Sequence, residues 1–263
     1  MAVLNFYTLN TAEQMDLFYS EEDKLNLNAV KEIMLENSAP YSNAEGVITG
    51  EGFFSIQTKV IEEKPLIECY CTAQGSLGYF YEAKVIEDQI TTTRTQHQYY
   101  SKALINITED NFLIIKFDYS NEESSKSKVK SIVEQLGFEA TIFRLDNDLL
   151  RKVQERYKWT AAKLDKIEKH GDSTKKVSYE IDPSDDQFQS EVDELYNEHG
   201  KMSHIKFEMP YRAPGAPNTV TVKLYSDGHR IVIDESEIPD PELFKGFIIH
   251  LLNTLYDLKT SQT

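Results

Sequence analysis

Hydrophobic and polar residues alternate with a period of two through much of the first 110 residues, which is typical of strands. The expected strands are 3–9, 53–61, 66–73, 79–86 and 101–108, and two short helices are expected at 11–19 and 28–36. In 66–73, Ile67, Cys69 and Cys71 point to one side, whereas Glu68 and Tyr70 point to the other. This part of the chain therefore predicts an antiparallel sheet with one solvated face.

The later part of the chain alternates strand and helix patterns. Strands are expected at 112–119, 139–144, 175–181 and 203–209, and helices at 124–136, 146–170 and 185–197. Strands that alternate with helices in this way are typical of crossover connections onto a sheet.

The segment 219–235 predicts a hairpin with a two-residue turn of the primed type at Asp227-Gly228. In that register Leu224 faces Ile231 and Val222 faces Ile233 on one side, while Tyr225 faces Arg230 on the other. A final amphipathic helix is expected after it, with Asp240 as N-cap and Pro241 at its first position. Its apolar face is broad enough for a core or for a subunit interface, and the core is the ordinary outcome.

The predicted fold class is α+β, with a mostly antiparallel N-terminal sheet region followed by an α/β region with crossover helices. We place the domains at 1–110 and 111–263, although no Pro/Gly linker marks that boundary and a single domain remains an alternative. No apolar run approaches the roughly 18 residues of a membrane span. The start of the chain lacks a secretory pattern, and two cysteines fit a reducing compartment, so we expect a cytoplasmic protein without a membrane partner.

Charge is unevenly distributed along the chain, which has a net charge of −16. Residues 1–110 carry −10 and residues 178–263 carry −9, whereas residues 111–177 hold 14 basic and 11 acidic residues and carry +3. An evenly acidic protein is merely soluble and self-repelling, but a basic segment inside an acidic chain can select a partner.

The expected helix 146–170 holds the main candidate site. Five residues repeat along it at helical spacing, beside an apolar stripe: Lys152, Arg156, Trp159, Lys163 and Lys166. Several cations on a rigid element suit phosphate backbones, and an aromatic residue among them can stack on a base. The alternatives are an ordinary solvated helix face and a docking surface for an acidic protein or for a second copy.

Catalytic patterns are weak. Glu82 and Lys84 match the second half of a metal-dependent nuclease signature, but the Asp of its first half is missing, and Glu62-Glu63-Lys64 matches equally well. Asp182, Asp185 and Asp186 suit a helix N-terminus better than a metal ion. Cys69 and Cys71 lack a second pair of zinc ligands and suit a core. We therefore expect no catalytic residues, no metal and no cofactor.

Three functions remain open at this level. The first is a non-catalytic protein that contacts nucleic acid through the basic helix, and a role in conflict between bacteria and mobile elements would suit such a chain. The second is an acidic interaction subunit or inhibitor that binds a basic protein or forms a homo-oligomer, and the third is a nuclease that uses Glu82 and Lys84.

Overall fold

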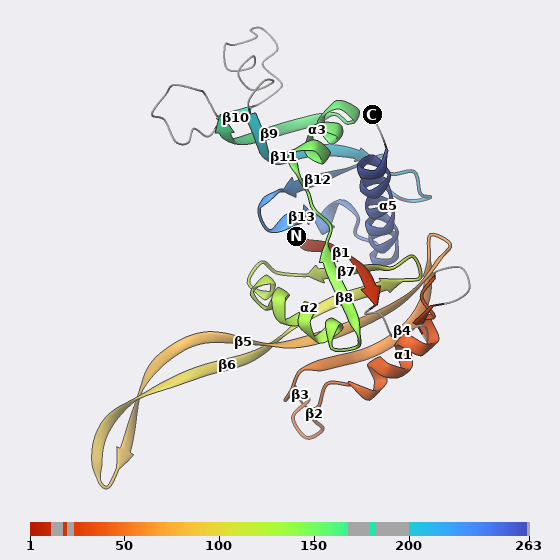
Figure 1. The fold of residues 1–263 in the computed structure, drawn as a ribbon. Helices are drawn as coiled ribbons and strands as arrows, with labels where there is room; N and C mark the ends of the chain where they lie inside the picture. The colour runs from red at the N-terminus through yellow and green to blue at the C-terminus, as the bar shows by residue number, and fades with distance from the viewer. Residues whose placement is uncertain (12–17, 20–23, 168–178, 182–199, 262–263) are drawn as a thin grey trace. The chain divides into compact units, whose positions relative to one another are not determined.

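The computed structural model describes residues 1–11, 18–19, 24–167, 179–181 and 200–261. The chain forms two compact units that are interleaved in sequence. Unit 1 comprises residues 1–7, 60–64 and 142–263, and unit 2 comprises residues 8–59 and 65–141 (Figure 1). The division between these units does not coincide with residue 110, so separate folding of 1–110 and 111–263 stays a prediction. The expected helix at 185–197 lies outside the described residues.

Unit 1 is an antiparallel sheet covered by helices on one face. Its strands follow the order β10-β9-β11-β12-β13-β1, and each pair whose register is known is antiparallel. The strands are β1 (Ala2–Thr11, shared with unit 2), β9 (Trp159–Ile167), β10 (Tyr179–Ile181), β11 (Gly200–Pro210), β12 (Thr219–Tyr225) and β13 (Arg230–Ile233). The helices are α3 (Asn147–Arg156), α5 (Pro241–Thr260) and the short 3₁₀ turns η3 (Asp227–His229) and η4 (Glu235–Glu237). Because these neighbouring strands are antiparallel, the expectation of crossover connections is wrong for this part of the sheet.

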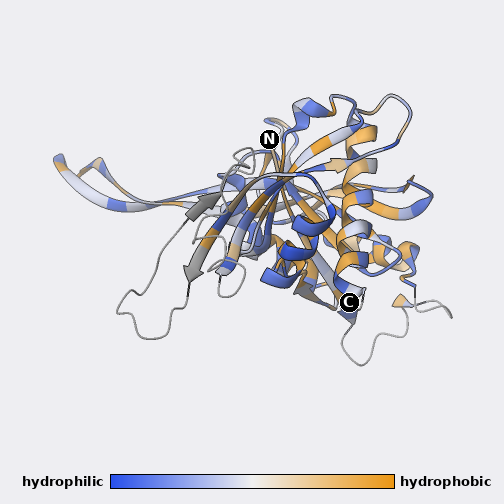
Figure 2. Cartoon of the chain, turned by 90° about the horizontal axis from the view of Figure 1, so that it is seen from above, coloured by the Kyte–Doolittle hydropathy of each residue, from blue (hydrophilic) through white to orange (hydrophobic). Residues whose placement is uncertain are grey.

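Helix α5 forms the core of unit 1 together with the sheet. It begins at Pro241 because the Asp240 carboxylate accepts hydrogen bonds from the backbone N–H groups of Glu242 and Leu243. Its buried residues are Phe244, Gly246, Phe247, Ile248, Ile249, Leu251, Leu252, Leu255 and Leu258. Figure 2 shows this helix as largely hydrophobic. Its apolar face is therefore core within the chain.

The expected helix 146–170 is wrong from Tyr157 to Ile167, and residues 168–170 lie outside the described residues. Tyr157 is extended, with φ −120° and ψ 152°, and residues Trp159–Ile167 form β9, which pairs with β11. Ala162 and Leu164 are buried while Lys163 between them is exposed, which is the period of a strand. The apolar positions of 157–167 fit both periods, and pairing with β11 decides between them.

The β12–β13 hairpin pairs Val222 with Ile233 and Leu224 with Ile231. Its turn differs from the expected primed two-residue turn. Ser226 has right-handed helical angles, and the positive φ values fall at Gly228 and His229 rather than at the two residues Asp227 and Gly228. The loop therefore holds four residues between Tyr225 and Arg230.

Unit 2 is built on the strand order β7-β6-β5-β4, all in one sheet. The strands are β4 (Gly52–Ile61), β5 (Lys64–Ile86), β6 (Gln89–Thr108), β7 (Phe112–Phe117) and β8 (Phe138–Ile142), with the small pair β2 (Tyr41–Ser42) and β3 (Val47–Ile48). The helices are α1 (Leu27–Glu36), η2 (Glu122–Ser125) and α2 (Lys126–Glu134). Strand β7 is buried throughout, as its apolar run predicts.

Strands β5 and β6 continue beyond the core of unit 2 as a two-stranded ribbon, residues 74–100, which we call the arm (Figure 1). The sequence predicted two separate strands at 66–73 and 79–86, but β5 is continuous through both. Its ladder with β6 shifts register between Ser76 and Gly78 and continues to the pair Ile86–Gln89. Glu87 and Asp88 both have positive φ and close the arm with a tight turn.

One ion-pair cluster in unit 2 gives a pH-dependent prediction. The Asp118 carboxylate accepts hydrogen bonds from Lys116, at 2.6 Å, and from Lys102, at 2.7 Å. Burial raises the pKa of the Asp118 carboxyl, but the hydrogen bonds and charges of the two lysines outweigh burial and lower it below its usual value. A carboxyl with a lowered folded-state pKa stabilises the fold above its unfolded pKa, and this contribution is lost as the pH falls through the folded value.

We therefore expect Asp118→Asn to lower the free energy of unfolding at neutral pH by about 1–3 kcal/mol. The difference from wild type should shrink as the pH falls below about 4, where an unfolded aspartate becomes protonated, and should disappear as the pH falls through the lowered folded-state pKa. Urea unfolding at several pH values measures both effects. Asp88→Asn, in the exposed arm turn, is the matched control and should change little. A difference that persists unchanged in acid would contradict this explanation.

Candidate nucleic-acid interface

One face of the unit 1 sheet is apolar and buried, and the other is polar. Along β11 the buried side chains of Ile205 and Phe207 alternate with the partly exposed side chains of His204, Lys206 and Glu208. The same alternation continues on β12 and β13. Because successive side chains in a strand point to opposite faces, the polar residues share the face opposite the buried core. We call the set Lys163, His204, Lys206, Lys223, Tyr225 and Arg230 the open face.

A row of four polar residues crosses four neighbouring strands. His204 pairs with Lys163 of β9 and with Tyr225 of β12, and Tyr225 pairs with Arg230 of β13. The rings of His204 and Tyr225 stack, with centroids 4.5 Å apart and planes at 23°. The Arg230 guanidinium carbon lies 4.7 Å from the Tyr225 ring centroid. The row is therefore an ordered stack of rings and a guanidinium group, with a lysine beyond it on β9.

The next row places two lysines directly opposite each other. Lys206 of β11 pairs with Lys223 of β12. Like charges at directly opposite positions of an antiparallel pair destabilise the sheet. Both lysines line a hollow of about 150 Å³, together with Met1, Thr221, Val232, Asp234 and Glu237. The carboxylates of Asp234 and Glu237 in the same hollow offset part of this repulsion, and Lys223 interacts with Asp234.

Acidic residues limit the positive area on one side. Hydrogen bonds from the backbone N–H and hydroxyl of Ser236 lower the pKa of the Asp234 carboxyl, so it is charged at neutral pH. The Glu237 carboxylate accepts a hydrogen bond from the Thr221 backbone N–H at 2.7 Å. Glu208 forms an ion pair with Lys158 at 3.1 Å. Acidic residues therefore border the hollow that Lys206 and Lys223 line.

The structure separates the five predicted site residues. Lys152 lies on α3 and donates to the backbone carbonyls of Leu258 and Ser261, so it joins α3 to the end of α5. Arg156 is exposed at the end of α3. Trp159, Lys163 and Lys166 lie on β9, where Trp159 pairs with Phe207 and Lys166 with Lys201. Of the predicted set, only Lys163 belongs to the open face.

The sequence patterns did not point to the five other residues of the open face. These residues lie in strands that the patterns did predict, at 203–209 and 219–235, on the side opposite the apolar residues. The alternation of apolar and polar residues could have indicated them, because the polar positions of these segments carry cations although the protein is acidic. The sequence pattern does not show that β11 lies between β9 and β12 in the sheet.

Glu82 and Lys84 lie on the arm. The Glu82 carboxylate is 3.7 Å from Lys84 Nζ and 2.7 Å from His97 Nε2. Glu68, the sequence stand-in for the missing acid, is buried in the core of unit 2 and bonded to Lys59 at 2.7 Å. No group of three or more His, Cys, Asp or Glu suited to a metal occurs in the part of the chain that the structure describes. Among the described residues, the structure therefore does not place a second carboxylate beside Glu82 and Lys84 that could complete a metal site for a nuclease.

The sequence also offered an aspartate cluster and a cysteine pair as candidate metal ligands. Asp182, Asp185 and Asp186 lie outside the described residues. Cys69 and Cys71 are free thiols in the buried face of β5. Burial raises the pKa of both thiols, in Cys71 to about 12, and the neighbouring acids Glu68 and Glu51 add to the effect. Both side chains are therefore protonated packing residues at neutral pH.

Because the thiolate is the reactive form, both cysteines should resist alkylation in the folded protein. We expect no rapid labelling by a soluble maleimide at neutral pH, and labelling of two thiols per chain after unfolding in guanidinium. A mass spectrum of each sample counts the labels. Rapid native labelling of either residue would contradict the buried placement.

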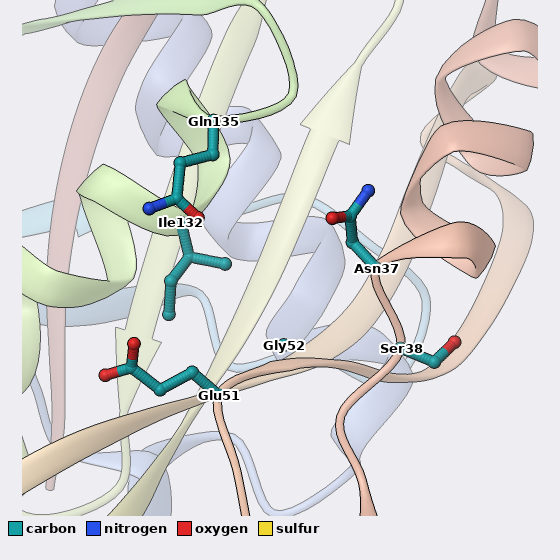
Figure 3. Close-up of a pocket in the computed structure, with 6 residues that line it drawn as sticks. All are labelled: Asn37, Ser38, Glu51, Gly52, Ile132 and Gln135. Carbon is teal, nitrogen blue, oxygen red and sulfur yellow. The ribbon is translucent and has the colours of Figure 1, made fainter.

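A second hollow, of about 230 Å³, lies in unit 2. Figure 3 shows Glu51 and Gln135 on one side of it and Asn37 and Ser38 on the other. These polar groups serve the fold: Glu51 accepts from the Gln74 backbone, and Asn37 and Ser38 donate to carbonyls of α1. The hollow therefore offers no concentration of charge comparable to the open face.

Among the described residues, no helix is both long and apolar enough to cross a membrane. Comparison with known proteins adds no functional assignment, because no model of a known protein family and no curated protein matches the chain.

Proposed function

We propose that the chain is a non-catalytic binding protein that contacts single-stranded nucleic acid through the open face of unit 1. The proposal keeps the class of partner expected from the basic segment and moves the contact from a helix to a sheet. The observation that carries it is the direct pairing of Lys206 with Lys223 beside the His204–Tyr225–Arg230 stack.

Charge supports a polyanionic partner. The chain has a net charge of −16, yet one face of the unit 1 sheet carries four basic residues: Lys163, Lys206, Lys223 and Arg230. Lysine and arginine side chains bind phosphates, and the release of counterions makes such binding steeply dependent on salt. Asp234 and Glu237 border the hollow of Lys206 and Lys223, so a polyanion held by these lysines would extend toward the row from Lys163 to Arg230.

Shape and ring chemistry support a single strand over a duplex. In the part of the chain that the structure describes, no helix projects from the open face in a way that would let it enter the groove of a duplex. Some sheets with aromatic residues on a polar face bind splayed single strands, whose bases contact the rings while cations hold the backbone. His204 and Tyr225 are partly exposed rings at the centre of one cationic row; because Tyr225 already contacts His204 and Arg230, a base would meet the exposed ring edges.

The proposal is tested by fluorescence anisotropy of labelled single- and double-stranded oligonucleotides, titrated with the full chain. We expect preferential single-strand binding at about 50 mM salt that weakens at least tenfold by about 300 mM salt. Arg156→Glu changes the helix surface first expected from the sequence and should leave binding unchanged. Absence of binding at low salt, or loss of binding only in Arg156→Glu, would contradict the proposal.

A further inference from the structure

The arm exposes several large apolar side chains to solvent. Tyr79, Tyr81 and Val85 alternate along β5 and so share one side of the ribbon with Ile90, which pairs with Val85; Arg94, which pairs with Tyr81, lies on the same side. Tyr81 is 75% exposed, Val85 70% and Ile90 82%. Large exposed apolar patches of this kind usually mark an interaction site.

The arm also has unpaired strand edges. Strand β4 extends only from Gly52 to Ile61 and so flanks only the base of β5, and β7 pairs with β6 only at residues 104–107. Between 74 and 100 the structure therefore shows no third strand among the described residues. An isolated two-stranded hairpin is marginally stable in water, whereas additional strands with a shared apolar face stabilise it. Exposed strand edges are templates for pairing with another chain unless charges or proline oppose it, and the two charges on the β5 edge of the arm, Glu82 and Lys84, are of opposite sign.

The sequence of the β5 edge is complementary to itself. If two copies pair antiparallel about a two-fold axis at Ala83, Glu82 of each copy lies opposite Lys84 of the other. In the same register Tyr81 lies opposite Val85, and Phe80 opposite Ile86. Opposite charges and aromatic–aliphatic pairs at directly opposed positions stabilise an antiparallel pair.

The neighbouring symmetric registers are less favourable. A shift that centres the axis on Glu82 places that carboxylate against its own copy, and a shift to Lys84 places two ammonium groups together. A shift by a single position opposes residues from different faces of the ribbon. Charge therefore selects the register centred on Ala83.

We propose that the arm is a self-association site, in which β5 edges of two copies pair about Ala83 to form a four-stranded sheet. Tyr79, Tyr81 and Val85 of both copies then form one face of that sheet. Within a chain Glu82 lies 3.7 Å from Lys84 and 2.7 Å from His97, and two Glu82–Lys84 pairs between chains are added to these contacts. This inference is independent of the open face and of nucleic-acid binding.

Charge reversal with rescue provides the test. Glu82→Lys opposes lysines at both ionic positions of a homodimer, and Lys84→Glu opposes carboxylates at both, so each variant alone should dimerise about tenfold or more weakly than wild type. An equimolar mixture of the two restores an opposite charge at each position and should form a heterodimer. Analytical ultracentrifugation over a range of protein concentrations measures the association of each sample.

Gln96→Glu is the matched control, since it adds a charge on the exposed side of β6, away from the proposed edge. It should associate as wild type does. Near-UV circular dichroism verifies that each variant is folded. The proposal is overturned by a monomeric wild type, by single variants that dimerise as tightly as wild type, by a mixture that stays monomeric, or by loss of association in Gln96→Glu alone.

Discussion

Reversal of both opposed lysines, Lys206→Glu with Lys223→Glu, should weaken binding of a single-stranded oligonucleotide by about 100-fold or more at low salt. Each substitution removes one phosphate contact and adds a carboxylate that repels the backbone. The salt dependence of the remaining binding should also become shallower, because fewer counterions are released. Anisotropy titrations at several salt concentrations give both quantities.

Binding and stability are measured separately for this double variant. Asp234 and Glu237 line the same hollow, so the two new carboxylates also add repulsion to the sheet, and urea unfolding verifies that the variant is folded under the conditions of the titration. The matched control is Lys128→Glu with Lys130→Glu on α2 of unit 2, which changes the net charge equally. It should weaken binding by no more than a few-fold, through long-range repulsion. An equal loss in both double variants would show that net charge, rather than the open face, governs binding.

Truncation of Phe247 should produce the largest loss of stability. This side chain is fully buried on α5, and its ring lies 5.3 Å from that of Tyr211. Phe247→Ala removes buried apolar surface and leaves a cavity, so we expect the free energy of unfolding to fall by about 3–5 kcal/mol. Urea unfolding followed by circular dichroism measures the change.

Tyr256→Ala is the control on the same helix, because that side chain is 41% exposed. It should cost less than about 1 kcal/mol. The two outcomes together distinguish a packed core from an α5 surface reserved for another subunit. A small effect of Phe247→Ala would mean that the apolar face of α5 is not the core of unit 1.

Sequence patterns predicted the structure correctly where capping residues and the spacing of apolar positions indicate the same element. Asp240 and Pro241 mark the start of α5, and its apolar positions recur at helical spacing. In the hairpin, the alternation of Val222 and Leu224 with polar residues gives the same cross-strand pairs that the structure contains. These features depend on contacts between near neighbours in the chain.

The failures have a shared physical cause. Residues 157–167 carry apolar positions that suit a helix or a strand, and only pairing with β11, about 40 residues later, makes them β9. The predicted cationic stripe therefore breaks between Arg156 and Lys163. The open face depends on the order of four strands, which alternation within any one strand does not contain.

The most direct test of nucleic-acid binding by the open face is photocrosslinking of the wild-type chain to an oligonucleotide that carries 4-thiouracil, followed by mass spectrometry of the crosslinked peptides. We predict crosslinks in β11 and β12, at or next to His204 and Tyr225, that decrease as salt is raised. Crosslinks confined to α3 or to the arm would contradict the assignment of the open face as the interface.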